Sequence, residues 1–451
     1  MNIKYRLTAM SFLQFFVWGA WLITIGTYCF NAKGWTGAQF GAIFSTLAIA
    51  SIFMPAITGI IADKWINTEK LYGVLHICYG LVLFYVPQVD DPDTLYYVIL
   101  LAMIFYMPTI SLSNSISYTI LKNNNYDVVK VFPPIRVWGT IGFIVAMWIT
   151  NLTGSKANAN QFIIGAVAAI ALGIYSFTLP KCPPQKSISK NATLAEQLGL
   201  NAFKLFANYK MALFFVFAMF LGAALQLTNM YGDSFLTDFG NVPIYADLIK
   251  KFETVFLPQL HNINNFWDKI IYTINYPNLI SSLVIKYSTI IMSISQISET
   301  LFILTIPFFL RRFGIKKVML FSMVAWVLRF GLFAYGNPAE GLWMIILSCI
   351  IYGMAFDFFN ISGSLFVETT TDSKIRSSAQ GLFMMMTNGF GAFTGSKISG
   401  YVIDKYYTHA EGKDWHGIWL AFAIYALIVT IAFALLFKHK HDPKAVGNLA
   451  H

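Results

Sequence analysis

Charged residues are scarce in this chain of 451 residues, in which Asp, Glu, Lys and Arg make up only 12%. Soluble domains carry about 25% of them, so the shortage excludes a soluble globular protein. Hydrophobic residues instead reach 57%, including 41 Phe, 23 Tyr and 11 Trp, which is typical of a polytopic membrane protein. The net charge of +10 does not indicate a nucleic-acid partner, because cytoplasmic loops of membrane proteins collect Lys and Arg.

Cysteine is also rare, and the sequence shows no motif of catalysis. The four cysteines, Cys29, Cys78, Cys182 and Cys349, form no CxxC pair, and three lie in apolar segments where a thiol behaves as a small hydrophobe. We therefore expect neither a disulfide nor a metal site. No nucleophile–base pair, HExxH motif or phosphate-binding glycine loop is visible, so we expect no catalytic residue and no cofactor. The N-terminal apolar run lacks a small-residue cleavage site and predicts a retained first helix.

Long apolar runs account for most of the chain, and each is long enough to cross a bilayer as a helix. The pattern predicts an all-α polytopic membrane protein with twelve transmembrane helices in two six-helix bundles. The bundles are residues 1–180 and 211–437, joined by a cytoplasmic linker at 181–210 and followed by a cytoplasmic tail at 438–451. The runs lie at about 8–30, 38–61, 71–89, 95–121, 135–153, 161–179, 211–235, 286–310, 317–336, 341–366, 376–402 and 415–437.

The basic residues predict the orientation in the membrane. With the N-terminus inside, 20 Lys and Arg lie on the cytoplasmic side and 8 outside, while Arg136, Arg329 and Lys397 lie in or at the edge of spans. Because cytoplasmic loops are enriched in basic residues, both termini are expected to be cytoplasmic.

Two turns at equivalent places relate the halves. Gly59–Lys64 (GIIADK) follows the second run and Arg311–Lys317 (RRFGIKK) follows the eighth. Six helices repeated in parallel are typical of major facilitator transporters, whose substrate site lies between the halves near the bilayer midplane. The external loop at 236–285 interrupts this regular repeat of helices and short turns. It is expected either to be a tolerated surface insertion or to hold short interfacial helices built from amphipathic stretches such as 266–272.

Glu299 and Asp357 are the two acidic residues that lie deep inside apolar runs. An ionised carboxylate at the bilayer centre costs about 2.5–3.5 kcal/mol on insertion scales. Acids kept there despite this cost usually face a partner or a water-filled path and can bind protons. We therefore interpret both as functional residues of a transporter.

Polar and aromatic side chains recur at helical spacing around these acids, so each set can line a cavity. Amides offer donors and acceptors to sugar hydroxyls, and aromatic rings stack on flat heterocycles, so the mixture fits a molecule with both a sugar and a ring. Alternatives remain open: lone amides can join helices, and Arg136 can be a snorkelling anchor near its helix end. The sets are Arg136, Thr140 and Phe143; Gln226 and Asn229; Gln296 and Glu299; and Tyr352, Phe356 and Asp357.

At these residues the chain resembles the nucleoside:proton symporters of the major facilitator superfamily, the bacterial inner-membrane nucleoside permeases. The resemblance spans nearly the whole chain, although the 236–285 loop looks longer than the family's. The stretches that carry it are SFLQFFVWGAW at 11–21, FMPAITGIIADKW at 53–65, FPPIRVWGTIGF at 132–143, MSISQISETLF at 292–302, AFDFFNISG at 355–363 and SAQG at 378–381.

The resemblance implies alternating access and uptake of purine and pyrimidine nucleosides with protons, in a multi-pass protein of the bacterial inner membrane. It implies nucleoside, protons and membrane lipid as partners, with the proton as coupling ion, and we expect a functional monomer. Asp357 is the expected proton carrier, and Glu299 has a dual role in proton coupling and substrate binding. The residues expected to bind substrate are Arg136, Thr140, Phe143, Gln226, Asn229, Gln296, Glu299, Tyr352 and Phe356.

Three alternatives to this reading stay open. One is a symporter restricted to a single nucleoside such as xanthosine, because a xanthosine-selective relative shares much of the pattern. Another is a symporter for a different polar solute such as an oligosaccharide. From a different class, an intramembrane enzyme or a solute sensor is disfavoured by the missing nucleophile and metal motifs and by the absence of a sizeable cytoplasmic domain.

Overall fold

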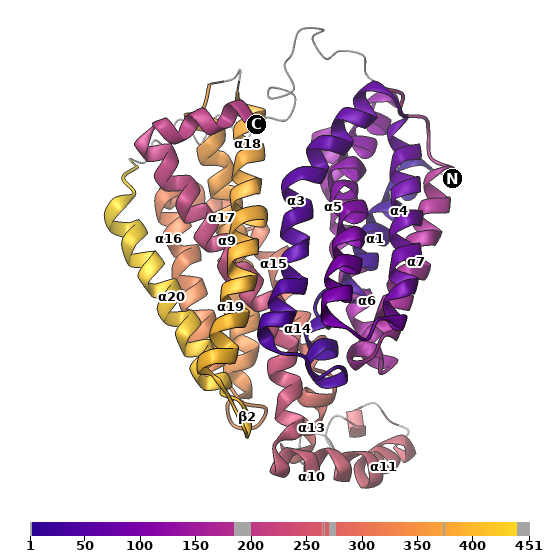
Figure 1. Ribbon diagram of the computed structural model, residues 1–451, viewed down its shortest axis with the longest axis vertical. Helices are drawn as coiled ribbons and strands as arrows, with labels where there is room; N and C mark the ends of the chain where they lie inside the picture. The colour runs from indigo at the N-terminus through magenta and orange to yellow at the C-terminus, as the bar shows by residue number, and fades with distance from the viewer. Residues whose placement is uncertain are drawn as a thin grey trace.

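Two groups of helices, one from each half of the chain, lie side by side in the computed structural model (Figure 1). The structure describes residues 2–184, 200–263, 265, 267–269, 277–372 and 375–439. Residues 185–199 of the expected linker and 440–451 of the expected tail therefore lie outside the described residues. Both chain ends lie at one end of the molecule (Figure 1), which we call the terminal end, and the opposite end is the distal end.

The first half consists of long helices with short connections. Its elements are α1 (Ile3–Gly19), α2 (Ile25–Thr27), the π-helical turn η1 (Tyr28–Ala32), α3 (Gly37–Lys64), α4 (Thr68–Tyr85), the 3₁₀ turn η2 (Val86–Gln88), α5 (Pro92–Asn123), α6 (Val128–Leu152), the 3₁₀ turn η3 (Ser155–Ala157) and α7 (Asn160–Ser176).

The second half is more interrupted. Its elements are η4 (Leu200–Ala207), α9 (Tyr209–Asp238), η5 (Phe239–Asn241), α10 (Pro243–Lys251), η6 (Phe252–Phe256), α11 (Leu257–Asn262), α13 (Pro277–Lys286), α14 (Ser288–Met292), α15 (Ile294–Ile303), α16 (Ile306–Tyr335), α17 (Leu342–Thr370), α18 (Arg376–Met384), η7 (Met385–Gly391), α19 (Ala392–Tyr406), the two-residue strands β1 (Thr408–His409) and β2 (Gly412–Lys413), and α20 (Trp415–Leu436).

Helix occupies each of the twelve expected runs, but not always as one continuous span. Among the described residues, eight helices are long and apolar enough to cross a membrane, or nine if the pair Leu279–Lys286 and Ser288–Ile303, bent by 80°, forms one span. The three remaining runs contain shorter or interrupted helices. These are α1 with α2 and η1 at 8–30, α7 at 161–179, and α18 with η7 and α19 at 376–402.

The turn expected at Arg311–Lys317 lies inside α16. Gly314 adopts φ +78° and ψ 166° there, a conformation that residues with a Cβ rarely adopt. The stretch before Gly314 therefore ends the run at 286–310, and the stretch after it forms the run at 317–336.

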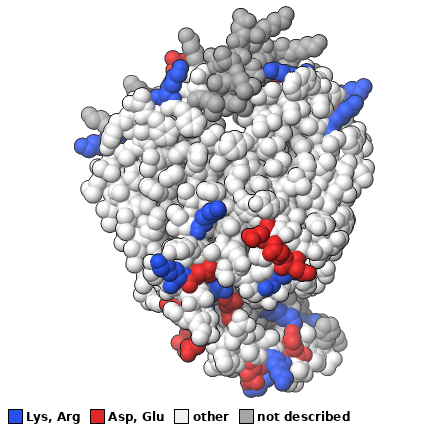
Figure 2. Space-filling model, in the orientation of Figure 1, with Lys and Arg blue, Asp and Glu red and all other residues white. Residues whose placement is uncertain are grey.

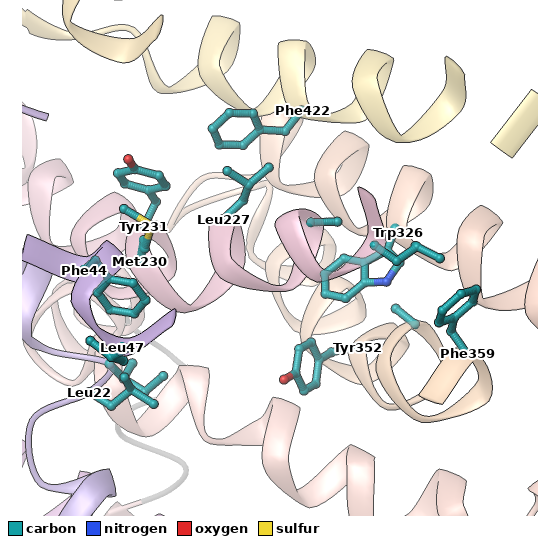
Figure 3. Packing of buried hydrophobic residues seen from close by; sticks show 14 of the residues in the cluster. Leu22, Phe44, Leu47, Leu227, Met230, Tyr231, Trp326, Tyr352, Phe359 and Phe422 are labelled. Carbon is teal, nitrogen blue, oxygen red and sulfur yellow. The ribbon is translucent and has the colours of Figure 1, made fainter. Parts of the chain in front are cut away.

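The buried core is continuous between the halves near the distal end. Leu22, Phe44 and Leu47 of the first half belong to the same buried cluster as Met230 and Tyr231 of the second half (Figure 3). Helices α2 and α9, α3 and α19, and α6 and α14 are in contact across the halves. Because lipid offers no hydrophobic force between helices, this packing stabilises the protein mainly through close van der Waals contact.

The surface separates into charged ends and an uncharged belt. On the face in Figure 2, charged side chains lie at the terminal end and over the distal half, and a broad belt without charge lies between these two regions. Large apolar side chains such as Ile174, Leu304, Ile428 and Leu435 are exposed. On a soluble monomer such a surface would be anomalous, whereas it suits contact with lipid tails.

The segment expected as a loop at 236–285 contains short helices. Helices α10, α11 and α13 lie at the distal end, beyond the main bundle (Figure 1). In α10, Ile244 is exposed and Lys251 pairs with Asp247 at 2.9 Å. Residues 264, 266 and 270–276 lie outside the described residues, and so does most of the amphipathic stretch at 266–272.

Candidate functional site

Helices α15 and α17 bring Glu299 and Asp357 into one neighbourhood. The helices approach so closely at Gly353 that a Cβ there would lie 2.6 Å from the Ser298 carbonyl oxygen and 2.8 Å from the Glu299 backbone nitrogen. The Ser298 hydroxyl also donates a hydrogen bond to the Ile350 carbonyl. This contact fixes Glu299 beside the aromatic face of α17, and the charges of Glu299 and Asp357 interact.

The aromatic part of the site comes from α17. The rings of Tyr352 and Phe356 are stacked with centroids 5.9 Å apart and an angle of 7° between their planes. Trp326 meets Tyr352 edge to face at 6.0 Å, and these two side chains lie close together in Figure 3. The i, i+4 spacing expected from the sequence thus produces a continuous aromatic wall.

Two polar atoms of the predicted site are buried without a hydrogen-bond partner among the described residues. They are Oδ2 of Asp357, a residue only 5% exposed, and Oε1 of Gln296. An unpaired buried polar group costs about 1–3 kcal/mol, and such groups call for an explanation such as a functional role or an unseen ligand. The Gln296 oxygen is therefore available to accept a hydrogen bond from a polar substrate, and the Asp357 oxygen to bind a substrate or a proton.

The first half contributes Arg136, Thr140 and Phe143 from α6, a helix in contact with α15. The Arg136 guanidinium lies over the Phe15 ring, 3.9 Å from its centroid, and its charge interacts with that of Glu299 across the halves. Phe143 is 9% exposed and packs edge to face on Trp18. Arg136 is therefore packed against a ring of the first half, and its charge acts on Glu299 of the second half.

Gln226 and Asn229 lie one turn apart on α9, and both are partly buried. These two residues and Thr140 are assigned to the site because of the helical faces on which they lie. Thr228, which lies between the two amides in the sequence, accepts a hydrogen bond from Nε of Arg329 at 3.2 Å.

Arg329 of α16 organises the walls of the site, although it was not among the residues expected to bind substrate. It is fully buried, and its guanidinium donates to the Ser348 carbonyl at 2.6 Å and to the Ser295 hydroxyl at 3.4 Å. It also lies over the Tyr352 ring at 4.6 Å. Arg329 thereby joins α9, α15 and α17, the three helices of the second half that carry predicted site residues. Its only signal in the sequence was a cation within an apolar run.

A cavity of about 550 Å³ lies toward the terminal end from the predicted site, and none of the predicted site residues lines it. It shares two helical faces with the site: Ile303 follows Glu299 by four residues on α15, and Asn360 follows Phe356 by four residues on α17. Its size falls within the usual range of small-molecule sites. The other residues that line it are Ile306, Pro307, Leu310, Arg311, Ile361, Ser364, Leu365, Glu368 and Gln380.

This combination of carboxyls, amides, a cation and stacked rings between two helical bundles agrees with a family model, nucleoside H⁺ symporter, that matches residues 1–442. The chain belongs to this family. The all-α polytopic fold and the resemblance expected from the sequence are both confirmed.

Relatives of known name match the chain over nearly its full length. The xanthosine permease of Escherichia coli is 49% identical, with 100% of this chain and 99% of the relative covered. The nucleoside permease NupG of the same organism is 47% identical, with 99% of both covered. A crystal structure of the nucleoside transporter NupG matches with a TM-score of 0.84 at 47% identity, covering 98% of this chain and all of the other.

Proposed function

We propose that this protein takes up nucleosides together with protons by alternating access of a site between its halves. The observation that carries the proposal is the Oδ2 of Asp357, which lies beside Glu299 and the Tyr352–Phe356 stack and has no partner among the described residues. A substrate with hydroxyl groups and a flat ring would use every part of this arrangement. The nucleoside names of the family and its relatives support the same substrate class.

The base of the nucleoside packs among Phe143, Tyr352 and Phe356, and base–aromatic stacking is worth about 1–3 kcal/mol per base. The sugar bonds to the amides Gln226, Asn229 and Gln296 and to Glu299. Arg136 orients the Glu299 carboxylate from the opposite half. Helix α6 belongs to the first half and α15 to the second, so substrate binding bridges the two halves.

Asp357 carries the coupled proton, and Glu299 takes part in coupling as well as in binding. Like charges in a low-dielectric site resist simultaneous ionisation, and Arg136 offsets only one of them. A proton taken up by Asp357 therefore lowers the cost of passing through the occluded state. One charge crossing 100 mV releases about 2.3 kcal/mol, enough for roughly 50-fold accumulation.

The basic residues support a placement of the terminal end, with both termini, in the cytoplasm. The cavity of about 550 Å³ then lies on the cytoplasmic side of the site. We place the protein in a bacterial inner membrane, with bundles at 1–180 and 211–437 around the linker at 181–210, and a single copy suffices for this mechanism.

The test is uptake of labelled uridine into proteoliposomes with an imposed proton gradient. The intact protein should accumulate uridine, and an uncoupler should abolish accumulation. Asp357→Asn should exchange uridine without uphill transport, whereas Asp93→Asn, at the exposed first turn of α5, should behave as the intact protein. Normal coupling in Asp357→Asn would refute the assignment of the proton carrier.

Selectivity for one nucleoside is the second candidate, because the xanthosine permease is as similar to the chain as NupG is. Uptake of labelled uridine, adenosine, guanosine, xanthosine and a disaccharide, each measured separately, distinguishes the alternatives. Uptake of xanthosine alone would indicate a restricted transporter, and uptake of the disaccharide alone would overturn the nucleoside class.

A further inference from the structure

Asp233 is another buried acid, and it lies outside the predicted site. It is located near the distal end of α9 and is 0% exposed. Three hydroxyl groups donate hydrogen bonds to its carboxylate: Thr27 to Oδ2 at 2.6 Å, Ser288 to Oδ1 at 2.8 Å and Thr289 to Oδ1 at 2.7 Å. Thr27 belongs to the first half and the two other donors to the second, so Asp233 connects the halves.

Lys156 adds a second connection at the same place. From η3 of the first half, its ammonium donates to the Ser288 hydroxyl at 2.7 Å and to the Ile285 carbonyl at 3.1 Å. Burial lowers the pKa of Lys156, which lies outside the spanning segments, and the negative charge of Asp233 opposes this shift. We call Thr27, Lys156, Asp233, Ser288 and Thr289 the distal cluster.

The distal cluster lies at the 80° bend between α13 and α14. A bend leaves backbone carbonyls without their helical partners. The first half supplies replacements, because Lys156 binds the Ile285 carbonyl and Asn151 donates to the Lys286 carbonyl at 3.2 Å. The geometry of the bend thus depends on contact between the two halves.

The same helices connect the distal cluster to the substrate residues. Asp233 follows Asn229 by four residues on α9, which is one turn. The helical segment Ser288–Ile303 begins at the distal cluster and carries Gln296 and Glu299 further along its length. Separation of the halves at the distal end would release Thr27 and Lys156 from these two helices.

We propose that Asp233 is a positioning residue for transport: its hydrogen bond from Thr27, together with Lys156, holds the distal end closed and must break before substrate can enter from that side. This proposal rests on the proposed alternating-access function and assigns its distal gate. A carboxylate suits such a gate because hydrogen bonds to a charged group are stronger than neutral ones, while Ser288 and Thr289 keep Asp233 partly satisfied after Thr27 leaves.

Thr27→Val tests the gate because it removes the donor and keeps the shape of the side chain. The matched control is Thr24→Val, since the Thr24 hydroxyl donates at 2.8 Å to Gln161 within the first half. Thr27→Ser restores the donor and should behave as the intact protein. Lys156→Met removes the second connection.

The measurement is the distance distribution between spin labels at Asp93→Cys and Glu411→Cys, two exposed positions in the described part of each half. The proteins are reconstituted in a Cys78→Ser background, because the other three native cysteines are buried. Thr27→Val and Lys156→Met should each raise the ratio of long to short distances about tenfold, which corresponds to about 1.4 kcal/mol. Thr24→Val and Thr27→Ser should leave the ratio unchanged.

An unchanged distribution in both Thr27→Val and Lys156→Met would overturn the gate, and so would an equal shift in Thr24→Val. The distances are recorded without a proton gradient or nucleoside, so this outcome is independent of the uptake experiment. A protein that shows the shift but transports no nucleoside would retain the gate and lose the proposed substrate.

Discussion

Asp233 and Asp357 are both buried acids in long helices of the second half, 0% and 5% exposed, yet their surroundings differ. Asp233 accepts three hydroxyl hydrogen bonds, whereas Oδ2 of Asp357 has no partner among the described residues. Burying a polar group is tolerable only when it is hydrogen-bonded. A satisfied carboxylate can hold two segments together, and an unsatisfied one is free to bind a proton or a substrate.

The comparison predicts unequal effects of the two substitutions on stability, and this is the largest difference that we expect. Asp233→Ala should lower the free energy of unfolding by about 3 kcal/mol, because it leaves hydroxyls of Thr27, Ser288 and Thr289 unpaired in a buried place. Asp357→Ala should change it by less than about 1 kcal/mol, because no bonded partner of Oδ2 is lost. Thermal unfolding of both variants in the same detergent measures the difference.

Equal loss of stability in the two variants would contradict the comparison. Asp233→Asn is a useful intermediate, because its carboxamide oxygen can still accept from Ser288 and Thr289. Its stability should fall between that of Asp233→Ala and that of the intact protein.

The difference between the two acids also explains what the sequence could reveal. Glu299 and Asp357 were predictable because an acid in the middle of an apolar run is expensive. Asp233 lies near the end of its run, where an acid costs little, and its role depends on hydroxyls that are distant in the sequence. Only the folded chain brings Thr27 and Ser288 to it.

The fold, like the buried acids, was predictable only in part from the sequence. Composition and apolar runs predicted the all-α membrane architecture and the turn at Gly314. The bend before Ser288 was not predictable, because its free carbonyls are bound by Lys156 and Asn151 of the other half. The boundaries of the bundles and the roles of the substrate residues stay predictions.

Arg329 extends the comparison to a buried cation. Its guanidinium, like the carboxylate of Asp233, is satisfied by hydrogen bonds. Arg329→Lys should lower stability by about 2 kcal/mol despite keeping the charge, since an ammonium cannot reproduce the fork that reaches Ser348, Ser295 and Thr228. Uridine binding should weaken as well, because the three helices that carry site residues lose their common partner. Melting curves and uridine binding to the variant in detergent measure both effects, and an unaltered melting temperature would show that the fork is dispensable.

Gln296 is the amide counterpart of Asp357, because its Oε1 is also buried without a partner among the described residues. Gln296→Leu should weaken uridine binding about tenfold, since it removes donors and acceptors for the sugar. It should not lower stability, because no internal hydrogen bond of Oε1 is lost. Isothermal titration with uridine tests the predicted affinity, and a melting curve tests the predicted stability. A destabilised variant that binds normally would reverse the interpretation of Gln296.

The smallest effect is expected at Tyr352, where the ring and the hydroxyl can be separated. The ring stacks on Phe356 and supports Arg329, so Tyr352→Leu should weaken uridine binding about fivefold through lost stacking. Tyr352→Phe keeps the stack and should change binding by less than about twofold, because stacking needs only the flat face of the ring. Uridine binding to both variants separates the contribution of the ring from that of the hydroxyl. If the Phe variant loses as much affinity as the Leu variant, the hydroxyl belongs with Gln296 and Asp357 among the polar groups that contact substrate, and the aromatic wall contributes less than its geometry indicates.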